Sequence, residues 1–223
     1  RPGMMVHPDD HERVNTLITH IQAYLYQKKE WSPYWENSFA PALCNRIDRN
    51  TGGIVIAAKT AEGLRVMNQK IRDRELKKYY LCIVHGTLPR PAGRLEGYIL
   101  KDEAKKQVTV SSRPRPGAKT AVTLYETLAV RNGLSLVRCQ LITGRTHQIR
   151  AQFAAAGHPL LGDGKYGSER QNKRYGRSYQ ALYSYRLEFC FTTDAGALAP
   201  LDGQQFQVEQ VDFVTEYFPG FSL

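Results

Sequence analysis

The sequence predicts an α+β fold in which a mixed or antiparallel sheet is flanked by helices. Short apolar runs and one long segment of period two are typical of strands, whereas other segments repeat apolar residues at helical spacing. The two kinds of segment do not alternate regularly along the chain, which disfavours a doubly wound parallel sheet. The 223 residues suffice for one large domain whose core needs neither disulfides nor a metal to fold.

The first part of the chain is predicted to form a helix followed by a loop. Residues 9–28 repeat apolar side chains at helical spacing, and Asp9 or Asp10 can cap this helix. The apolar positions are Val14, Leu17, Ile18, Ile21 and Leu25. Residues 31–41 contain tryptophans and prolines and predict a loop.

A strand, a helix and a second strand are predicted next. Residues 54–58 form a continuous apolar run that suits a buried strand. A helix is expected after Thr60, because apolar residues recur there at helical spacing. Residues 79–84 form another apolar run, which ends at Gly86 and predicts a second strand.

The middle of the chain is predicted to contain loops, a hairpin and a helix. Residues 88–119 are rich in Pro, Gly and Lys, which indicates loops and edge hairpins. Residues 122–130 and 134–142 flank an Arg-Asn-Gly turn and therefore predict a β-hairpin. A helix is expected over residues 145–156, with a glycine directly after it.

The last predicted strand spans residues 181–191. Apolar and aromatic side chains alternate there with more polar ones, as in a half-buried antiparallel strand. No internal repeat or low-complexity tract occurs in the sequence. The predicted strands are thus spread through the middle and the late part of the chain.

Basic residues are in excess and are unevenly distributed. The chain has 31 Lys and Arg against 21 Asp and Glu, a formal net charge of +10. No Lys or Arg follows residue 190, so the first 190 residues carry all 31 basic residues against 16 acids. This excess suits a polyanionic partner and favours nucleic acid over a merely soluble basic surface. An anionic membrane is disfavoured, because no amphipathic helix pairs a basic face with a Trp/Phe face.

The sequence also excludes or disfavours several classes of protein. No apolar run approaches the ~18 residues that a membrane-spanning helix needs, and no signal peptide is visible. The cysteines lie far apart without zinc-knuckle spacing and suggest reduced thiols in a cytoplasmic protein. They are Cys44, Cys82, Cys139 and Cys190. We therefore expect a cytoplasmic protein with no metal and no membrane partner.

The glycines at 162, 164 and 167 match the spacing of a dinucleotide-binding loop. A strand should precede such a loop and an apolar helix should follow it, but a Gly-His-Pro turn precedes it and a polar run follows. No Gly-Lys-Ser/Thr phosphate-binding loop occurs either. Tight turns explain these glycines better than a dinucleotide-dependent oxidoreductase does.

Two short segments carry groups suited to chemistry. In residues 45–53, Asp48 stands between Arg46 and Arg49, and flanking cations hold a carboxylate in the ionised form that a nucleophile needs. Residues 143–150 join a predicted strand to a predicted helix and offer cations where a helix N-terminus favours anions. A loop acid bound by backbone amides, and a capped helix with solvated arginines, are the commoner interpretations of such patterns.

Together these segments resemble the RluA-type family of RNA pseudouridine synthases. The strongest match reads LITGRTHQIRAQFAAAGHPLLGDGKYG, residues 141–167. Two further strong matches lie at residues 45–59 and 78–86, and weaker ones at 1–8, 119–123 and 180–182. The resemblance spans nearly the whole chain, and three ordered motifs at these spacings are highly specific.

The resemblance implies a single catalytic domain over residues 1–223. Its fold would have a central mixed or antiparallel sheet, flanking helices and a catalytic cleft. Many members carry a small RNA-binding S4 domain upstream, which is not found in these 223 residues. The catalytic string departs from the family at Asn45, Ile47 and Gly52, where His, Leu and Ser are usual. These changes spare the residues to which the family assigns the reaction.

The family isomerises uridine in RNA: the base detaches from C1′, turns, and reattaches through C5. The resemblance assigns the essential carboxylate to Asp48, which either attacks C1′ or removes a ribose proton to give a glycal-type intermediate. Tyr80 matches the active-site tyrosine, whose ring can stack on uracil and whose hydroxyl can carry a proton. Arg150 matches the arginine that should ion-pair with Asp48. No metal, nucleotide or redox cofactor is implied.

RNA is therefore the expected partner, and the protein is expected to be a monomer. The uridine must leave its stack, and basic side chains can hold the phosphates while it does. Expected substrate-binding residues are Arg46, Arg49, Lys78, Arg145, His147 and Gln148. Ribosomal RNA is the expected target. Transfer RNA, or an inactive RNA-binding module of the same fold, is the alternative.

Overall fold

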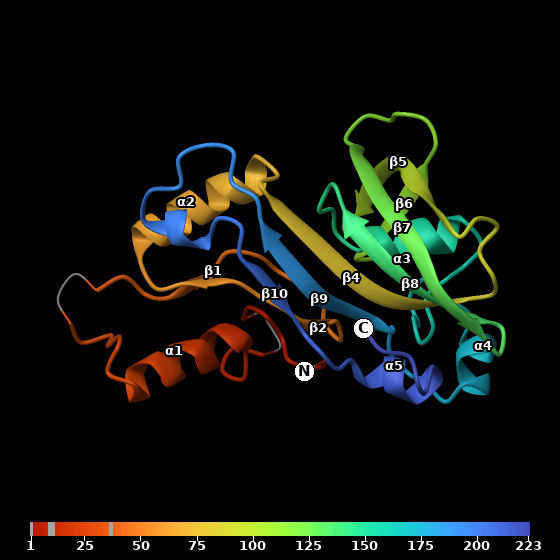
Figure 1. The fold of residues 1–223 in the computed structure, drawn as a ribbon, viewed down its shortest axis with the longest axis horizontal. Coiled ribbons are helices and arrows are strands. Elements are labelled where there is room, and N and C mark those ends of the chain that lie inside the picture. The colour runs from red at the N-terminus through yellow and green to blue at the C-terminus, as the bar shows by residue number, and fades with distance from the viewer. Residues whose placement is uncertain (1, 9–11, 36–37) are drawn as a thin grey trace. The chain divides into compact units, whose positions relative to one another are not determined.

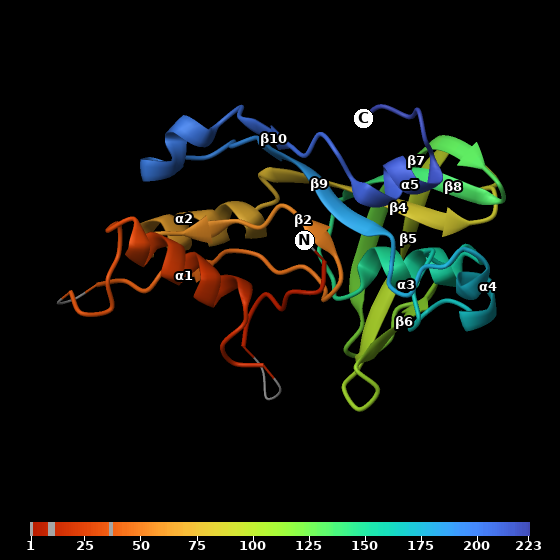
Figure 2. The same ribbon diagram turned by 90° about the horizontal axis from the view of Figure 1, so that it is seen from below.

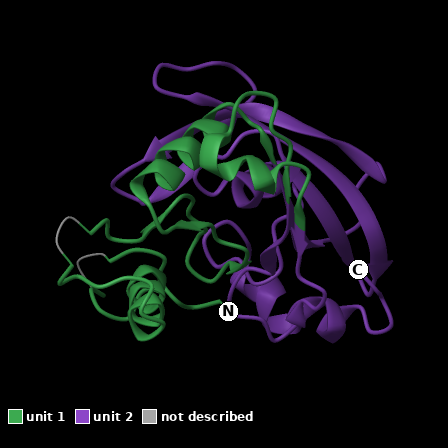
Figure 3. Ribbon diagram, turned by 60° about the vertical axis from the view of Figure 1, so that its left-hand side comes forward, with its two compact units in different colours: residues 1–76, 188–205 green, residues 77–187, 206–223 purple. Residues whose placement is uncertain are grey.

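The computed structural model describes residues 2–8, 12–35 and 38–223, and its chain divides into two compact units. Unit 1 consists of residues 1–76 and 188–205, and unit 2 of residues 77–187 and 206–223 (Figure 3). The chain thus leaves unit 1 and returns to it once before it ends in unit 2. The single domain expected over residues 1–223 stays a prediction.

A sheet of long strands forms the centre of unit 2. Its strands follow the order β9-β4-β8-β7-β5-β6, with β10 beside β9. Their bounds are β4 (Leu76–His85), β5 (Ala92–Asp102), β6 (Gln107–Ser111), β7 (Lys119–Arg131), β8 (Leu134–Leu141), β9 (Leu182–Phe189) and β10 (Gln205–Gln207). The pairs β4–β8, β8–β7, β7–β5 and β5–β6 are all antiparallel. The expected α+β fold with a central sheet and flanking helices is therefore confirmed.

Three short helices cover the two faces of this sheet. They are α3 (Gln148–Ala155), α4 (Glu169–Arg174) and α5 (Asp212–Tyr217). Figure 2 shows α3 and α4 on one side of the strands and α5 on the other. Strand β4 contributes to both sides, because successive side chains of a strand point to opposite faces.

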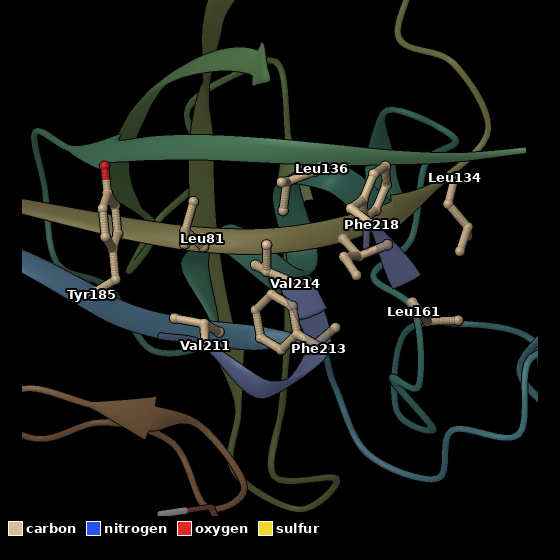
Figure 4. Packing of buried hydrophobic residues seen from close by; sticks show 11 residues of the cluster. Leu81, Leu134, Leu136, Leu161, Tyr185, Val211, Phe213, Val214 and Phe218 are labelled. Carbon is tan, nitrogen blue, oxygen red and sulfur yellow. The ribbon is translucent and has the colours of Figure 1, made fainter. Parts of the chain in front are cut away.

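On the α5 side, Leu81 and Ile83 of β4 are fully buried in one apolar cluster with Phe213, Val214 and Phe218 (Figure 4). Burying an aliphatic or aromatic side chain of this size contributes about 1.5–3 kcal/mol. The sequence did not predict helix α5. It is held by these apolar contacts, since a six-residue helix is marginal in isolation.

On the α3 side, Tyr80 and Cys82 of β4 join a second buried cluster. Ile149 and Phe153 of α3 supply the helix side of this cluster, and Phe153 has no exposed surface. Tyr80 is therefore fixed on the face of the sheet that α3 covers. This placement brings it close in the fold to the segment that precedes α3.

The hairpin predicted over residues 122–142 is confirmed as β7 and β8. Its two turn residues, Asn132 and Gly133, have φ angles of 51° and 74°. Positive φ at both central positions is the geometry of a two-residue type I′ turn, which Asn-Gly prefers. The local sequence therefore determines the turn that joins these two strands.

Unit 1 is built from two helices and short strands. Its elements are α1 (Leu17–Gln27), β1 (Ala42–Leu43), β2 (Gly52–Gly53), β3 (Ala57–Ala58), α2 (Ala61–Arg72) and the 3-10 helix η1 (Gly196–Leu201). Strand β1 pairs antiparallel with β3, and α2 lies against η1 (Figure 1). Val6, Ile18 and Leu43 form a small buried core.

The helix expected over residues 9–28 is shorter than predicted, because α1 begins at Leu17. Thr16 caps it: its hydroxyl accepts the Thr19 N–H, and the Thr19 hydroxyl accepts the Thr16 N–H. This reciprocal capping satisfies two backbone donors and defines the start of the helix. Val14 is 79% exposed and lies before it. The proposed caps, Asp9 and Asp10, lie outside the described residues.

Other element boundaries also needed correction. The strand expected over residues 54–58 is reduced to Ala57–Ala58, and the Ile56 N–H is bound by the Asn45 side chain at 2.8 Å. The loops and edge hairpin expected within residues 88–119 are confirmed, because β5 and β6 form an antiparallel pair and β6 lies at the sheet edge. The other predicted elements are confirmed with shifts at their ends.

One ion pair is completely buried within unit 1. The Lys70 ammonium, on a side chain 1% exposed, lies 2.7 Å from a Glu75 carboxylate oxygen. It also donates to the backbone and side-chain oxygens of Thr193 at 2.6 and 2.7 Å, and lies 4.9 Å from the centre of the Phe191 ring. These contacts join the end of α2 to residues 191–193, which belong to the second chain segment of unit 1.

This network predicts acid sensitivity. The hydrogen bond from Lys70, with those from Thr192 and Thr193, lowers the pKa of Glu75 from 4.5 to about 2. A lowered native pKa adds stability above the unfolded value, and this stability is lost as pH falls from 4.5 toward 2. Urea unfolding between pH 2 and pH 7 measures this effect. Glu75→Gln should lower the free energy of unfolding at neutral pH and make it depend less on pH.

A matched control is Glu62→Gln, which removes an exposed carboxylate from α2, the helix that carries Lys70. It should leave both the stability and its dependence on pH close to those of the wild type. If the stability of Glu75→Gln fell between pH 4.5 and pH 2 as steeply as that of the wild type, Glu75 would not be the group responsible for the acid sensitivity.

Candidate active site

The loop that carries Asp48 lies in unit 1, between β1 and β2. Its base is closed by the β1–β3 pair and by the bond from the Ile56 N–H to the Asn45 side chain. Within the loop the Thr51 N–H donates to the Asp48 carbonyl oxygen at 2.9 Å. Asn50 has a φ of 68°, a left-handed conformation that Asn tolerates better than most residues. Asp48 thus stands in a fixed tight turn.

The surroundings of Asp48 are basic. Its neighbours Arg46 and Arg49 are exposed, whereas Asp48 itself is half-buried. Burial, followed by the positive charge of Arg46, lowers the pKa of His7. The structure therefore combines in one turn the carboxylate and the two cations that the sequence places together.

Strand β4 in unit 2 positions Tyr80 and Lys78 on the same face. They are two residues apart, and their register partners on β8 are Cys139 and Leu141. Tyr80 is 8% exposed, whereas Lys78 is half-buried. The Lys78 ammonium lies 3.5 Å from where a Cβ on Gly144 would stand, so it reaches the loop that precedes α3.

Gln148 shapes this loop. It is 2% exposed; its side-chain oxygen accepts from the Thr143 hydroxyl and the Arg145 N–H at 2.8 and 3.0 Å. Its side-chain nitrogen donates to the Val122 carbonyl and the Thr123 hydroxyl. All four bonds stay within unit 2, which gives Gln148 a role in fixing the loop. A contact between Gln148 and substrate stays a prediction.

Arg145 and His147 both belong to this loop and contact different neighbours. The Arg145 guanidinium donates to the Thr120 carbonyl at 3.0 Å. His147 precedes α3 with a φ of 51°, which explains why this helix begins at Gln148 rather than at residue 145. Its Nδ1 lies 2.8 Å from the Tyr166 hydroxyl, which also accepts the Val108 N–H. This chain of contacts links the loop to β6.

Arg150 is held by Asp163 in a buried pair. Its Nε and Nη2 donate to the two carboxylate oxygens at 2.7 and 3.0 Å, and the side chains are 8% and 0% exposed. Burial raises the pKa of Asp163, but the hydrogen bonds and charge of Arg150, with the N–H groups of Lys165 and Tyr166, outweigh it and lower the pKa overall. The guanidinium also lies 5.3 Å from the Tyr166 ring centre.

The expected site residues thus fall into two groups. Unit 2 brings together Tyr80, Lys78, the loop before α3, and Arg150; unit 1 carries Asp48 with its two arginines. The pairing of Asp48 with Arg150 stays a prediction.

Sequence reasoning missed Asp163 and Tyr166 as partners of this site. Both lie in the segment LGDGKYG, inside the longest family-like string, but nothing in their spacing showed that they contact Arg150 and His147.

The glycine-rich segment at 162–167 is explained by close packing. A Cβ on Gly162, whose φ is 79°, would lie 2.0 Å from the Tyr179 carbonyl oxygen. A Cβ on Gly167 would lie 2.5 Å from the Asp163 carbonyl oxygen. Both positions therefore need glycine for the chain to approach itself, in agreement with the tight turns expected from the sequence.

The described residues show neither a metal cluster nor a membrane span. No three His, Cys, Asp or Glu side chains among them are grouped so that they could hold a metal ion. No helix in the same part of the chain is long and apolar enough to cross a membrane. The four cysteines are free thiols, with Cys82 and Cys139 buried and their sulfurs 3.7 Å apart.

The chain belongs to the RNA pseudouridylate synthase family, whose model matches residues 1–155. This range includes Asp48, Tyr80 and Arg150, so the family shown is the one that the motifs indicated. The chain also shares its fold with the human protein RNA pseudouridylate synthase domain containing 4, with a TM-score of 0.71 and 22% identity. That similarity covers 96% of this chain and 84% of the human one.

Two curated relatives illustrate the similarity in sequence. An uncharacterized RNA pseudouridine synthase of Mycoplasma genitalium is 38% identical over 84% of this chain and 58% of its own length. The ribosomal large subunit pseudouridine synthase D of Zymomonas mobilis is 31% identical over 96% of this chain and 63% of its own length. The chain thus spans about three fifths of the length of these relatives.

Proposed function

We propose that this protein is an RNA pseudouridine synthase. The observation that carries the proposal is the family match over residues 1–155, which contains the acid, the tyrosine and the arginine expected for the reaction. In that reaction the C1′–N1 bond of uridine breaks, the uracil turns, and a C1′–C5 bond forms. The proton lost from C5 is balanced by one gained at N1, so the product is an isomer of the substrate.

Asp48 acts at the ribose in this proposal, while Tyr80 contacts the uracil. The tight turn around Asp48 and its two neighbouring arginines support the first role, because they hold a carboxylate among positive charges. The fixed position of Tyr80 beside α3 supports the second. Arg150 ion-pairs with Asp48 in the reacting complex and is itself oriented by Asp163.

Ribosomal RNA is the proposed substrate. It is supported by the relatives named ribosomal large subunit pseudouridine synthase D, from Zymomonas mobilis and Borreliella burgdorferi. Transfer RNA is the alternative. In either case the basic residues of the chain would contact phosphates as the uridine leaves its stack, which costs a few kcal/mol. The protein acts in the cytoplasm, as a monomer and without a metal or cofactor.

The test compares pseudouridines in RNA from cells with and without the protein. We expect specific pseudouridines to disappear from ribosomal RNA and to return when the purified protein is added to the unmodified RNA. Loss of sites from transfer RNA alone would replace the proposed substrate. Binding without any isomerisation would favour the inactive RNA-binding module.

Affinity for RNA should depend strongly on salt. If phosphate contacts dominate, the logarithm of the association constant falls linearly with the logarithm of salt concentration, by about 0.7 per contact for single-stranded RNA. Several contacts should therefore give a slope steeper than about −2. Fluorescence anisotropy of a labelled single-stranded RNA measures this slope. A flat response would show that the basic excess before residue 191 is not an RNA-binding surface.

A further inference from the structure

Lys78 has an unusual environment for a lysine. It lies on the α3 face of β4, two residues before Tyr80 and opposite Leu141 of β8. Its ammonium comes within 3.5 Å of the Cβ position of Gly144, at the loop that precedes α3. The charge is therefore held beside the tyrosine, over a backbone segment without a side chain at that point.

The Lys78 ammonium is partly shielded from water, yet it has no partner among the described residues. Burial lowers the pKa of Lys78, and among the described residues it makes no ion pair or hydrogen bond. The buried Lys70 in unit 1 is the opposite case, because its ammonium has a carboxylate and two further oxygens as partners. A partly buried charge is stabilised by an opposite charge nearby, so a bound anion would compensate the ammonium where the fold provides no partner.

The position of Lys78 along β4 indicates which part of the substrate it contacts. Two residues of a strand separate Lys78 from Tyr80 by about 6.7 Å. If Tyr80 contacts the uracil, Lys78 stands about this far from the base, a distance at which it can reach the phosphate next to that nucleotide. An ammonium is a compact point charge that suits a phosphate. A phosphate held there would also stabilise the flipped nucleotide.

We propose that Lys78 binds the backbone phosphate next to the flipped uridine and so positions that nucleotide against Tyr80. This proposal rests on the proposed function, since it takes the uridine contact of Tyr80 from it. The role is binding of the substrate rather than chemistry on the base.

The binding test uses a short single-stranded oligouridylate and the full chain. Lys78→Met should weaken affinity about tenfold, the loss expected when a hydrogen bond to a charged group is removed. It should also make the salt slope less steep by about 0.7, because one phosphate contact is lost. Lys78→Arg, which keeps the charge, should restore most of both. Unchanged affinity and slope in Lys78→Met would overturn the proposal.

The matched control is Lys101→Met. Lys101 is 51% exposed in β5 and paired with Glu103, so the change removes the same charge from the surface of unit 2. Its affinity for oligouridylate should stay within about twofold of the wild type, because exposed charges contribute little singly. An equal loss in both variants would mean that total charge, rather than the place of Lys78, determines binding. Thermal unfolding of each variant checks that it is folded.

Two further measurements separate this proposal from its rivals. On an oligouridylate with uncharged methylphosphonate linkages, Lys78→Met and the wild type should bind equally; a persistent difference would mean that Lys78 contacts the base. On RNA that the wild type modifies, Lys78→Met should lose kcat/KM mainly through KM, and a loss confined to kcat would overturn the binding role. Oligouridylate affinity is measured without turnover, so an inactive wild type would count against the proposed function alone.

Discussion

Asp48→Asn should reduce pseudouridine formation to background, a loss of about a thousandfold or more, as expected when an essential carboxylate is removed. Asn keeps the size of the side chain but has neither the charge nor the nucleophilicity of the acid. The turn should survive, because the hydrogen bond that closes it runs from the Thr51 N–H to the backbone oxygen of Asp48. Release of tritium from C5-labelled uridine in RNA measures the rate.

Folding and RNA affinity of Asp48→Asn should change little, which separates a chemical loss from a structural one. Asp73→Asn, at the exposed end of α2, is the matched control in the same unit and should retain full activity. Turnover of Asp48→Asn within about tenfold of the wild type would show that another group supplies the essential carboxylate.

Asp163→Asn should destabilise unit 2 by about 3–5 kcal/mol, because it removes the negative charge from a buried ion pair with Arg150. The substitution keeps an oxygen for the N–H groups of Lys165 and Tyr166, so the charge of the pair is the main property that changes. Urea unfolding of the wild type and the variant at neutral pH measures the difference. Activity should fall as well, since Arg150 would lose the group that orients it.

Glu126→Gln provides the contrast, because Glu126 pairs with Arg138 at the surface, where the side chains are 49% and 37% exposed. An exposed pair is worth less than about 1 kcal/mol. Combining Asp163→Asn with Arg150→Met removes both charges and should recover part of the stability. If Asp163→Asn lost no more stability than Glu126→Gln, the buried pair would not hold the start of α3.

The sequence could predict elements whose signals are local. The Asn132-Gly133 turn determines a hairpin through the φ angles that these two residues accept. The alternation in β9 indicates a strand with two different faces, and the apolar run in β4 indicates a buried strand. Motif residues such as Asp48 and Tyr80 were recognised because their string of neighbours is specific to a family, and this required no knowledge of contacts.

The tertiary structure alone decided how charges are compensated. Lys70 is fully buried with acceptors from residues 75 and 193, whereas Lys78 is half-buried with none among the described residues. Both are lysines near the ends of regular elements, and their local sequence does not distinguish them. The cost of a buried charge depends on partners that are distant in the chain, so only the fold shows which lysine is satisfied.

The sequence by itself determined the α+β class, the family and the residues on which the proposed reaction depends. Periodicity, turn chemistry and motif strings are properties of neighbouring residues and can be seen without a fold. Tertiary structure decided that α1 begins at Leu17, that Asp163 holds Arg150, and that the chain divides into two units. These features arise from capping, burial and pairing between separated segments, whose free energies exist only once the chain is packed.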